Sequence, residues 1–337
     1  MMMAGSDSDT PLFRTVVPVS SNTRRISHGS SIMSIGSCFA ENIGTQLTAY
    51  RFEPLRNPTG VVYNPLSLAA NLKRFLDGRH YAAEETFEHE GNWRSFDYHS
   101  QFIAPSQEEL LHKLNRILSS THTSLNSLHT LIITLGTAYG YFLAGTKRIV
   151  SNCHRLPANQ FDRKLISVED AAARLSEVLE RLIVLRPSLN VILTVSPVRH
   201  LRDDPHENSI SKAHLICTAA ALEHTFSENV FYFPAYEIMM DELRDYRFYG
   251  SDMAHPSSVA INYIWKRFCG ACLSEKAQRF IHDYESIRSA RRHRIDEPTS
   301  TQTKRFARTM LDRLDALKQT CPEVSLDDDR DYFQTLL

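Results

Sequence analysis

The sequence predicts an α/β protein in which helices cover both faces of a doubly wound, mainly parallel sheet, giving a three-layer sandwich. Four apolar segments favour this fold, at residues 30–36, 129–135, 189–198 and 229–235. They lack the polar alternation of a half-exposed strand, and continuous apolar runs are typical of strands buried on both sides. Segments with helical periodicity separate them, so successive strands are expected to run parallel.

The first half of the chain is expected to continue from its strand into three helices. Apolar residues recur at helical spacing over 38–52, and a second helix over 65–78 has proline at its start and glycine just past its end. A third helix is expected over 106–118, with Ser106 as its N-cap. Residues 79–105 are aromatic without clean periodicity, which predicts a structured excursion over one face of the sheet.

The second half repeats the pattern of strand and helix. Residues 140–150 are expected to form a hairpin around the sequence Ala-Gly-Thr-Lys. Helices are expected over 167–187 and 209–226, and a short one over 239–246. A closing helix is expected over 256–273, after a proline.

Composition divides the chain into two predicted regions. Residues 11–275 hold all the predicted strands and form the expected α/β domain. Residues 276–337 are charged and helical, which predicts a C-terminal extension, with a break within 289–305. The first ten residues are small and polar, so we expect a disordered lead-in.

The charge balance and the cysteine content exclude several functional classes. Lys and Arg number 38 against 39 Asp and Glu, without a long block of one sign, so neither a nucleic acid nor an anionic membrane is an expected partner. The six cysteines are scattered, which is typical of free thiols in a reducing compartment. The start has no signal-peptide pattern, and no apolar run approaches the length of a membrane span. We therefore expect a cytoplasmic protein, and the oligomeric state is left open.

Two short stretches could together supply a nucleophile and its base. Gly36, Ser37 and Cys38 follow the first predicted strand, where a tight turn into a helix can expose a nucleophile. Asp252 and His255 are three residues apart on a loop before the last predicted helix. At this spacing the carboxylate can accept from one ring nitrogen and leave the other facing a nucleophile. Alternatively, the pair is only a helix cap beside a surface histidine.

The order of motifs resembles a known family. The glycine-x-nucleophile turn and the Asp-x-x-His-Pro turn are similar to the first and last sequence blocks of the SGNH (GDSL-type) hydrolases. The whole motif set, from about residue 11 to about residue 275, resembles the GSCFA family, a bacterial branch of that superfamily. The motifs are "GSCFAENIG", "NPTGVVYNP", "LGTAYGY", "NCHR", "TVSPVRH", "YFPAYEIMMDELRDYRFY" and "DMAHPS".

The resemblance implies an SGNH-hydrolase-like sandwich with an ester-directed site. The superfamily's first block is Gly-Asp-Ser with the serine as nucleophile, and in this register Gly36, Ser37 and Cys38 occupy the three positions. Cys38 is therefore the expected nucleophile, and Ser37 is the alternative. A helix start and a nearby histidine are expected to lower the pKa of the Cys38 thiol. The resemblance makes His255 the general base and Asp252 its orienting partner, whereas an inert, buried Cys38 would be purely structural.

The expected oxyanion site departs from the superfamily. Its third block usually offers Gly-x-Asn, and Ala138 stands at the place of the asparagine. Asn152 is our leading substitute donor, with the backbone N–H groups of the nucleophile and of Gly60 or Gly136. Alternatively, Asn152 only holds its loop together.

Three further residues complete the expected site. His154, Arg199 and His200 lie on predicted loops at strand ends and are candidates for contacting substrate, although Arg199 could equally be a structural arginine in a salt bridge. The histidines lack the usual spacing of metal ligands, so no metal is expected. The sequence has neither a dinucleotide-binding glycine motif after a strand nor a phosphate loop, so no cofactor is expected.

These observations lead to a functional hypothesis with two alternatives. The chain is expected to hydrolyse an acyl ester through a covalent acyl-enzyme, on a small-molecule or carbohydrate substrate. One alternative is an acyltransferase that takes its acyl group from a thioester, for which a thiol nucleophile is well suited. The other is a non-catalytic binding protein on an SGNH-like fold, which the alanine at position 138 favours.

Overall fold

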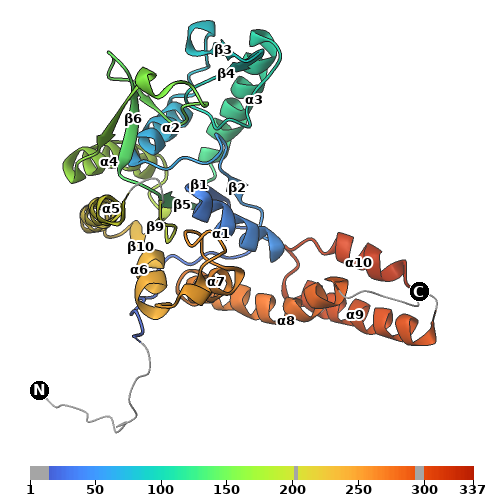
Figure 1. Cartoon of the computed structure of the whole chain (residues 1–337). Coiled ribbons are helices and arrows are strands. Elements are labelled where there is room, and N and C mark those ends of the chain that lie inside the picture. The colour runs from blue at the N-terminus through green and yellow to red at the C-terminus, as the bar shows by residue number, and fades with distance from the viewer. Residues whose placement is uncertain (1–14, 201–203, 293–299) are drawn as a thin grey trace, which may run out of the picture.

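A computed structural model describes residues 15–200, 204–292 and 300–337, and a five-stranded parallel sheet lies at its centre (Figure 1). In spatial order the strands are β10 (Val230–Tyr232), β9 (Asn190–Val195), β5 (Thr130–Leu135), β1 (Ile32–Gly36) and β2 (Leu55–Arg56). The predicted α/β class and parallel sheet are confirmed. Strand β2 was not predicted because two residues are too few to show a periodic pattern.

Helices cover both faces of the sheet because the side chains of each strand alternate between two cores. Ile32, Ile132 and Ile192 pack on one side with α1 and α7, whereas Met33 and Ile133 face the other side with α2, α3, α4 and α5. The α-helices of the described residues are α1 (Cys38–Ala49), α2 (Pro65–Asp77), α3 (Gln107–Leu125), α4 (Val168–Leu185), α5 (Pro205–Thr225), α6 (Ala235–Glu237), α7 (Ser258–Cys272), α8 (Glu275–Arg292), α9 (Thr301–Thr320) and α10 (Asp327–Gln334).

Side-chain caps determine where several helices begin. Ser106 accepts a hydrogen bond from the backbone N–H of Glu109, which confirms its predicted role as the N-cap of α3. Ser167 and Ser257 cap α4 and α7 in the same way. Each cap satisfies an N–H group that has no partner within the helix. The end of α3 was predicted less well, since the helix continues to Leu125.

The strand order changes direction between β1 and β5. From β1 the chain passes through α1 to β2 at one edge, then returns through α2 and α3 to β5. It continues outward through α4 and α5 to β9 and β10. In open α/β sheets such a reversal leaves a crevice at the carboxyl ends of the strands, where ligands bind. The ends of β1 and β5 are therefore the place to look for a site.

Two small antiparallel sheets lie beside the central sheet. The predicted hairpin is present as β6 (Tyr139–Leu143) and β7 (Ile149–Val150), and β8 (Phe161–Leu165) pairs with the other edge of β6. The aromatic excursion contains the hairpin of β3 (Phe87–His89) and β4 (Asn92–Arg94). Strand β8 was not predicted because its sequence, FDRKL, has three charged residues in a row.

Two sequence predictions after β9 are wrong in detail. The fourth predicted strand, over 229–235, is shorter, since β10 ends at Tyr232. Pro234 follows and has no N–H to donate to a neighbouring strand. The short helix predicted over 239–246 is a π-helical turn at Ile238–Glu242.

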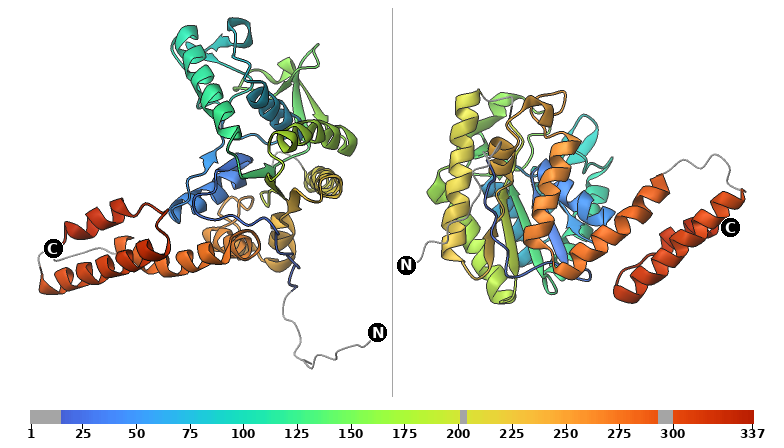
Figure 2. Two further views of the ribbon diagram at one scale, coloured as in Figure 1. Left: turned by 180° about the vertical axis from the view of Figure 1, so that it is seen from behind. Right: turned by 90° about the horizontal axis from the view of Figure 1, so that it is seen from below.

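Helices α8, α9 and α10 project from the α/β body as an arm (Figure 2). Asp329 in α10 is fully buried and anchors this arm to the body. It accepts hydrogen bonds at 2.7 Å from Tyr284 Oη and from Arg291, and it also pairs with Arg51, which follows α1. Apart from Glu275, the arm lies within the residues of the predicted C-terminal extension, 276–337. The break was predicted within 289–305, where the described residues belong to the end of α8 and the start of α9. Residues 293–299 and the predicted lead-in over 1–10 lie outside the described residues.

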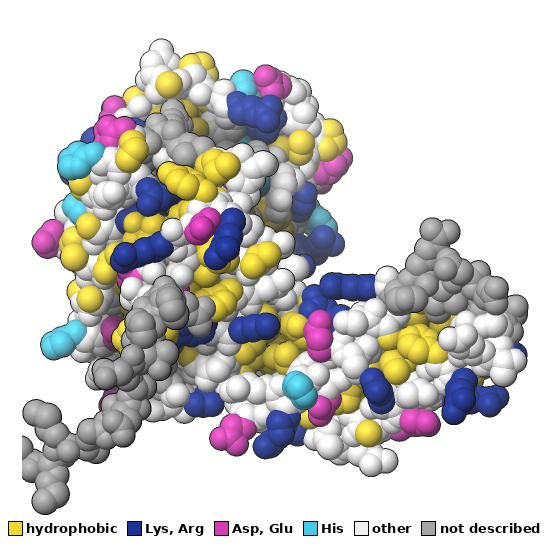
Figure 3. All heavy atoms as spheres, turned by 60° about the horizontal axis from the view of Figure 1, so that its bottom comes forward, with side chains coloured by type: hydrophobic (Ala, Val, Ile, Leu, Met, Phe, Trp, Pro, Cys, Tyr) yellow, Lys and Arg dark blue, Asp and Glu magenta, His cyan; other side chains and the backbone are white. Residues whose placement is uncertain are grey.

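Charges of both signs are interspersed on the surface of the body and the arm that faces the viewer in Figure 3. This distribution agrees with the nearly equal totals of basic and acidic residues. Among the helices that are described, none combines the length and the apolar composition needed to cross a membrane.

Candidate active site

A cavity of about 490 Å³ opens at the carboxyl ends of the central strands. Ser37 and Cys38 after β1, Thr137 after β5 and Ser196 after β9 line its floor. The small sheet β7-β6-β8 forms one wall, and the loop that carries His255 forms another. The cavity thus lies over the reversal in strand order. Three of the four predicted strand ends meet there, whereas the end of β10 does not line the cavity.

The turn after β1 depends on glycine. Gly36 has a φ of +135°, and a Cβ at this position would lie 2.2 Å from the carbonyl oxygen of Thr134 in β5. Any side chain would therefore clash with the neighbouring strand. The tight turn allows Ser37 to cap α1, and Cys38 becomes the first residue of that helix.

Ser37 and Cys38 differ in exposure and in bonding. The side chain of Ser37 is buried, and its hydroxyl oxygen accepts a hydrogen bond from the backbone N–H of Phe39. Cys38 is half-buried, lines the cavity and forms no disulfide. The sulfur is therefore the more available of the two candidate nucleophiles.

The thiol of Cys38 is less acidic than its place at a helix start predicts. Burial raises its pKa, and this effect exceeds the opposing effects of the nearby Lys212 charge and of the backbone N–H groups of Cys38 and Phe39. The expected lowering of this pKa is therefore wrong. Desolvation disfavours the thiolate more than the helix start favours it.

Asp252 and His255 form the predicted pair. The Oδ2 atom of Asp252 lies 2.6 Å from Nδ1 of His255, and Oδ1 accepts from the backbone N–H groups of Ala254 and His255. Backbone hydrogen bonds from His255 and Ala254, followed by the contact with the His255 ring, lower the pKa of Asp252 to about 2. The carboxylate therefore stays ionised and fixes the ring through Nδ1, which leaves Nε2 for other partners.

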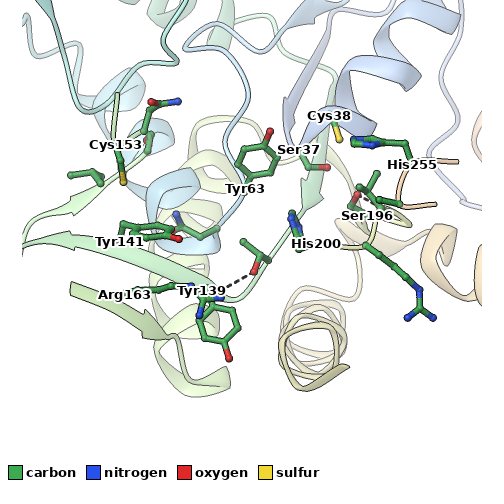
Figure 4. Close-up of a pocket in the computed structure, with 18 of the residues that line it drawn as sticks. Ser37, Cys38, Tyr63, Tyr139, Tyr141, Cys153, Arg163, Ser196, His200 and His255 are labelled. Atoms are coloured by element: carbon green, nitrogen blue, oxygen red, sulfur yellow. Dashed lines mark hydrogen bonds between the residues drawn. The ribbon is translucent and has the colours of Figure 1, made fainter. Parts of the chain in front are cut away.

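The histidine ring points toward the thiol. Figure 4 shows the His255 imidazole extending from its loop toward Cys38. No hydrogen bond joins these two side chains in the described structure.

A buried lysine that sequence analysis missed lies under the same turns. Lys212 in α5 is only 1% exposed, and its Nζ donates to the carbonyl oxygens of Gly136 at 2.7 Å and Ser196 at 2.8 Å. Burial lowers the pKa of this ammonium to about 7, although the charge of Cys38 acts against that effect. A lone lysine inside a predicted amphipathic helix gives no sequence signal for such a position.

Tyr63 is a second residue that sequence analysis did not select. Its backbone oxygen accepts from the N–H groups of Gly136 and Thr137, which fixes the loop before α2 against the end of β5. Its ring lines the cavity and lies beside Ser37 in Figure 4. Burial, followed by the charge of Cys38, raises the pKa of Tyr63, so its hydroxyl keeps its proton.

The proposed oxyanion donors are only partly available. The N–H of Gly136 donates to Tyr63 at 2.8 Å, and the N–H of Gly60 donates to the carbonyl of Asn57 at 2.7 Å. Gly60 does not line the cavity. Neither the N–H of Gly136 nor that of Gly60 is therefore free to donate to an oxyanion, so both expectations are wrong. Ala138 is buried in the core and does not line the cavity either.

Asn152 does line the cavity. Its side-chain oxygen accepts from the backbone N–H of His154 at 2.8 Å, so the amide also ties its loop together. Its neighbour Cys153 lies at the far end of the cavity from Cys38 in Figure 4. This position makes Asn152 a better candidate for contacting a bound molecule than for contacting the reacting atom.

His154 is not part of the site. It is 2% exposed and does not line the cavity, and its Nε2 contacts the carbonyl oxygen of Ser95 at 2.8 Å. Burial lowers its pKa to about 4. The expectation that His154 contacts substrate is therefore wrong, since it serves as a neutral core residue.

Arg199 and His200 both line the cavity, as expected. The backbone N–H of Arg199 donates to Ala254, which ties the loop after β9 to the His255 loop. The Arg199 guanidinium contacts the sulfur of Met240 at 3.4 Å. Nε2 of His200 lies 3.1 Å from the carbonyl oxygen of Gly136, so His200 supports the floor of the cavity.

The parts of the chain that the structure describes contain no cluster of three or more side chains placed to hold a metal ion. The fold and site therefore define an α/β protein that brings a thiol, an imidazole and a carboxylate to one cavity at the carboxyl ends of the strands of a parallel sheet. The chain belongs to the GSCFA family, whose model matches residues 31–268. A second model, described as the GSCFA domain protein, C-terminal domain, matches residues 284–337. No curated protein matches the sequence.

Proposed function

We propose that this protein hydrolyses acyl esters through a covalent intermediate on Cys38. One observation carries the proposal: Cys38 and the hydrogen-bonded pair of His255 and Asp252 line the same cavity, although more than 200 residues separate them along the chain. A nucleophile, a base and a group that orients the base are the minimum set for acyl transfer.

The proposed reaction has two steps. In the first, Nε2 of His255 takes the thiol proton, and the sulfur attacks the acyl carbonyl to form a thioester. The alcohol leaves with the proton that His255 returns. In the second step, His255 deprotonates a water molecule that attacks the thioester, which releases a carboxylic acid and restores the thiol. Asp252 keeps the imidazole oriented through Nδ1 and stabilises its charged form.

The oxyanion of each tetrahedral intermediate needs donors other than the superfamily's asparagine. The backbone N–H of Cys38 starts α1 and has no acceptor within the helix. The hydroxyl of Tyr63, which keeps its proton, is the proposed second donor. Asn152 is then assigned to substrate contact at the other end of the cavity.

A carbohydrate ester fits the wall formed by the small sheet. Tyr139 and Tyr141 both line the cavity because they are two residues apart on β6. Arg163 on β8 also lines it, and its guanidinium carbon lies 3.5 Å from the centre of the Tyr139 ring. Aromatic side chains with polar edges suit a sugar, whose faces carry C–H groups and whose rim carries hydroxyls. The acyl group would then lie near Cys38 and the sugar near β6.

The strand order supports an SGNH-like, doubly wound fold as part of the same proposal. The order β2-β1-β5-β9-β10 is a common order of doubly wound proteins, with its reversal beside the nucleophile turn. An acyltransferase that uses a thioester donor is the second candidate, because acyl transfer from a thioester to the Cys38 thiol exchanges one thioester for another. A binding protein is the third, because Ala138 leaves the usual oxyanion position without a donor.

A turnover screen tests the proposal. The full chain is incubated with short acyl esters, acetylated sugars and acyl thioesters, with and without a sugar as acceptor. Release of acid from esters in the wild type, but not in Cys38→Ala, supports the hydrolase. Acyl transfer to the sugar, with little hydrolysis, would favour the transferase. Binding of a sugar without any turnover would favour the third candidate, a non-catalytic binding protein.

A further inference from the structure

A second pocket shares a wall with the candidate active site, namely the loop of residues 249–255. Tyr249 and Met253 of this loop line the second pocket, whereas Asp252 and His255 line the candidate active site. The pocket has a volume of about 340 Å³, which is within the range of small-molecule sites. We call it the methionine pocket, because three methionines line it: Met239, Met240 and Met253.

The methionine pocket presents apolar side chains to solvent. Tyr246 and Met253, which both line it, are 78% and 52% exposed. Apolar side chains that gather around a hollow indicate a binding surface, unlike single exposed ones. Methionine side chains are flexible and polarizable, so they adapt to ligands of irregular shape. The lining therefore suits an aliphatic chain.

Arg199 brings an unmatched positive charge to this pocket. It lines the pocket and is partly buried, and its Nη2 atom lies 3.4 Å from the sulfur of Met240, a weak acceptor. Within residues 15–200, 204–292 and 300–337, no carboxylate forms an ion pair with Arg199, although charges removed from water are normally paired. The other charged side chains of the pocket have partners of opposite sign: Arg244 pairs with Asp241 at 2.8 Å, and Asp245 with Arg247 at 3.9 Å.

We propose that the methionine pocket binds an amphipathic carboxylate, that is, an aliphatic chain that ends in one carboxyl group. The carboxylate pairs with Arg199, whose planar guanidinium can donate two parallel hydrogen bonds to it. The chain packs against Met240, Met253 and Tyr246. A phosphate monoester is a poorer match, because it carries nearly two negative charges and only one positive charge is unmatched here. The inference goes beyond the proposed function and does not depend on any reaction at Cys38.

The two ends of Arg199 face different spaces. Its backbone N–H donates at 3.2 Å to the carbonyl oxygen of Ala254, a residue that lines the candidate active site. Its guanidinium contacts Met240, which lines the methionine pocket and not the candidate active site. The charged group is therefore assigned to the methionine pocket. Side chains that line only one of the two spaces test this assignment.

The first experiment measures the affinity of the full chain for octanoate by isothermal titration calorimetry. Arg199→Met should weaken binding at least about tenfold, the effect of losing a hydrogen bond to a charged group. Arg244→Gln is the matched control, because this arginine lines the same pocket but already pairs with Asp241. It should change the affinity less than about twofold. Butyrate should bind at least about tenfold more weakly than octanoate, because it buries less apolar surface.

Two tyrosine variants locate the ligand. Tyr246 lines the methionine pocket, whereas Tyr141 on β6 lines the candidate active site. Tyr246→Ser should weaken octanoate binding at least about threefold, because apolar contact surface is lost. Tyr141→Ser should leave the affinity unchanged. An effect of Tyr141→Ser as large as that of Tyr246→Ser would place the carboxylate in the candidate active site and overturn the inference.

A second measurement applies even if Arg199→Met does not fold. The wild type, labelled with ¹³C in its methionine methyl groups, is titrated with octanoate and followed by NMR. The signals of Met240 and Met253, assigned from their replacement by leucine, should move, whereas that of Met33, buried in the core of the α/β body, should not. Unmoved signals of both pocket methionines at millimolar octanoate, or undiminished affinity in folded Arg199→Met, would overturn the inference.

The pocket and the proposed function fail separately. If octanoate binds in the methionine pocket but no ester or thioester is turned over, the pocket stands and the catalytic function is wrong. If turnover depends on Cys38 while octanoate does not bind, the enzyme stands and the proposal for the pocket is wrong.

Discussion

The two sides of the candidate site differ in their exposure to water. The side chains of Asp252 and His255 are 49% and 55% exposed, whereas Ser37 and Lys212 are each 1% exposed. On the exposed side, hydrogen bonds from the backbone of His255 and Ala254 and from the His255 ring lower the pKa of Asp252. Its carboxylate is therefore ionised. On the buried side, desolvation dominates and raises the pKa of the thiol. In the proposed mechanism, an exposed imidazole would therefore deprotonate a half-buried thiol whose thiolate form is disfavoured by desolvation.

The largest expected effect comes from changing the nucleophile on the buried side. Cys38→Ser should lower kcat/KM at least about a thousandfold, because a hydroxyl of high pKa depends wholly on the base. Ser37→Ala should lower it about tenfold, since only a helix cap is lost. Steady-state kinetics on the best ester from the screen measures both. A Ser37→Ala variant without activity, beside an active Cys38→Ser, would make Ser37 the nucleophile.

The second largest effect is expected in the free energy of unfolding when Gly36, in the buried turn after β1, is changed. Gly36→Ala should lower the free energy of unfolding by about 3 kcal/mol or more, because it adds strain at positive φ to a clash with Thr134. Urea denaturation followed by circular dichroism measures the loss. Gly145→Ala is a matched control, since its φ is also positive but no atom lies within 4 Å of the added Cβ. Equal losses in both variants would contradict the importance of the close approach to β5.

On the exposed side, the pKa of Asp252 should respond only in part to loss of its partner. In the wild type, a ¹³C titration of the carboxyl should have its midpoint near 2. In His255→Ala the midpoint should rise but stay below the ordinary 3.8, because the backbone N–H groups of residues 254 and 255 still donate. The lowered pKa stabilises the folded state above pH 3.8, and this contribution disappears as the pH falls toward 2. A midpoint at 3.8 in the variant would assign the shift to the ring alone.

The smallest effect is expected in the exposed loop itself. Met253 has a φ of +55° and is 52% exposed. Met253→Gly should change the free energy of unfolding by less than about 1 kcal/mol, because relief of strain and greater freedom of the unfolded chain oppose each other. Thermal and urea unfolding measure this. A loss as large as that of Gly36→Ala would show that the loop is as tightly constrained as the buried turn.

The contrast also explains what could be predicted from the sequence. Strands buried on both faces and helices with serine caps leave strong local patterns, so the parallel sheet and most helices were predicted. The turn at Gly36, Ser37 and Cys38 and the pair of Asp252 and His255 are short motifs whose members are close in sequence. Gly60 and His154 were misplaced because a loop residue gives no sign of which way its polar groups point.

Lys212 could not be predicted for a different reason. Its role depends on the ends of two strands and on a turn far away in sequence, and a single lysine in a helix is more often a surface residue. The raised pKa of Cys38 was missed on the same grounds, since burial is a property of the whole fold. Short motifs in the sequence thus predicted that Cys38, Asp252 and His255 come together. The burial that shifts the pKa values of Cys38 and Lys212 depends on the whole fold.

Capture of the intermediate is the most direct test of the central claim, that Cys38 carries the acyl group. The wild type is mixed with an activated acyl ester, stopped with acid after a few milliseconds to seconds, and digested for peptide mass spectrometry. The account predicts one acyl adduct, on the peptide that contains residues 36–40, and fragmentation should localise it to Cys38. The adduct should be absent in Cys38→Ala. The account also predicts that the adduct accumulates in His255→Ala only slowly, since the base is missing. An adduct on Ser37, or turnover without any adduct on this peptide, would contradict the account.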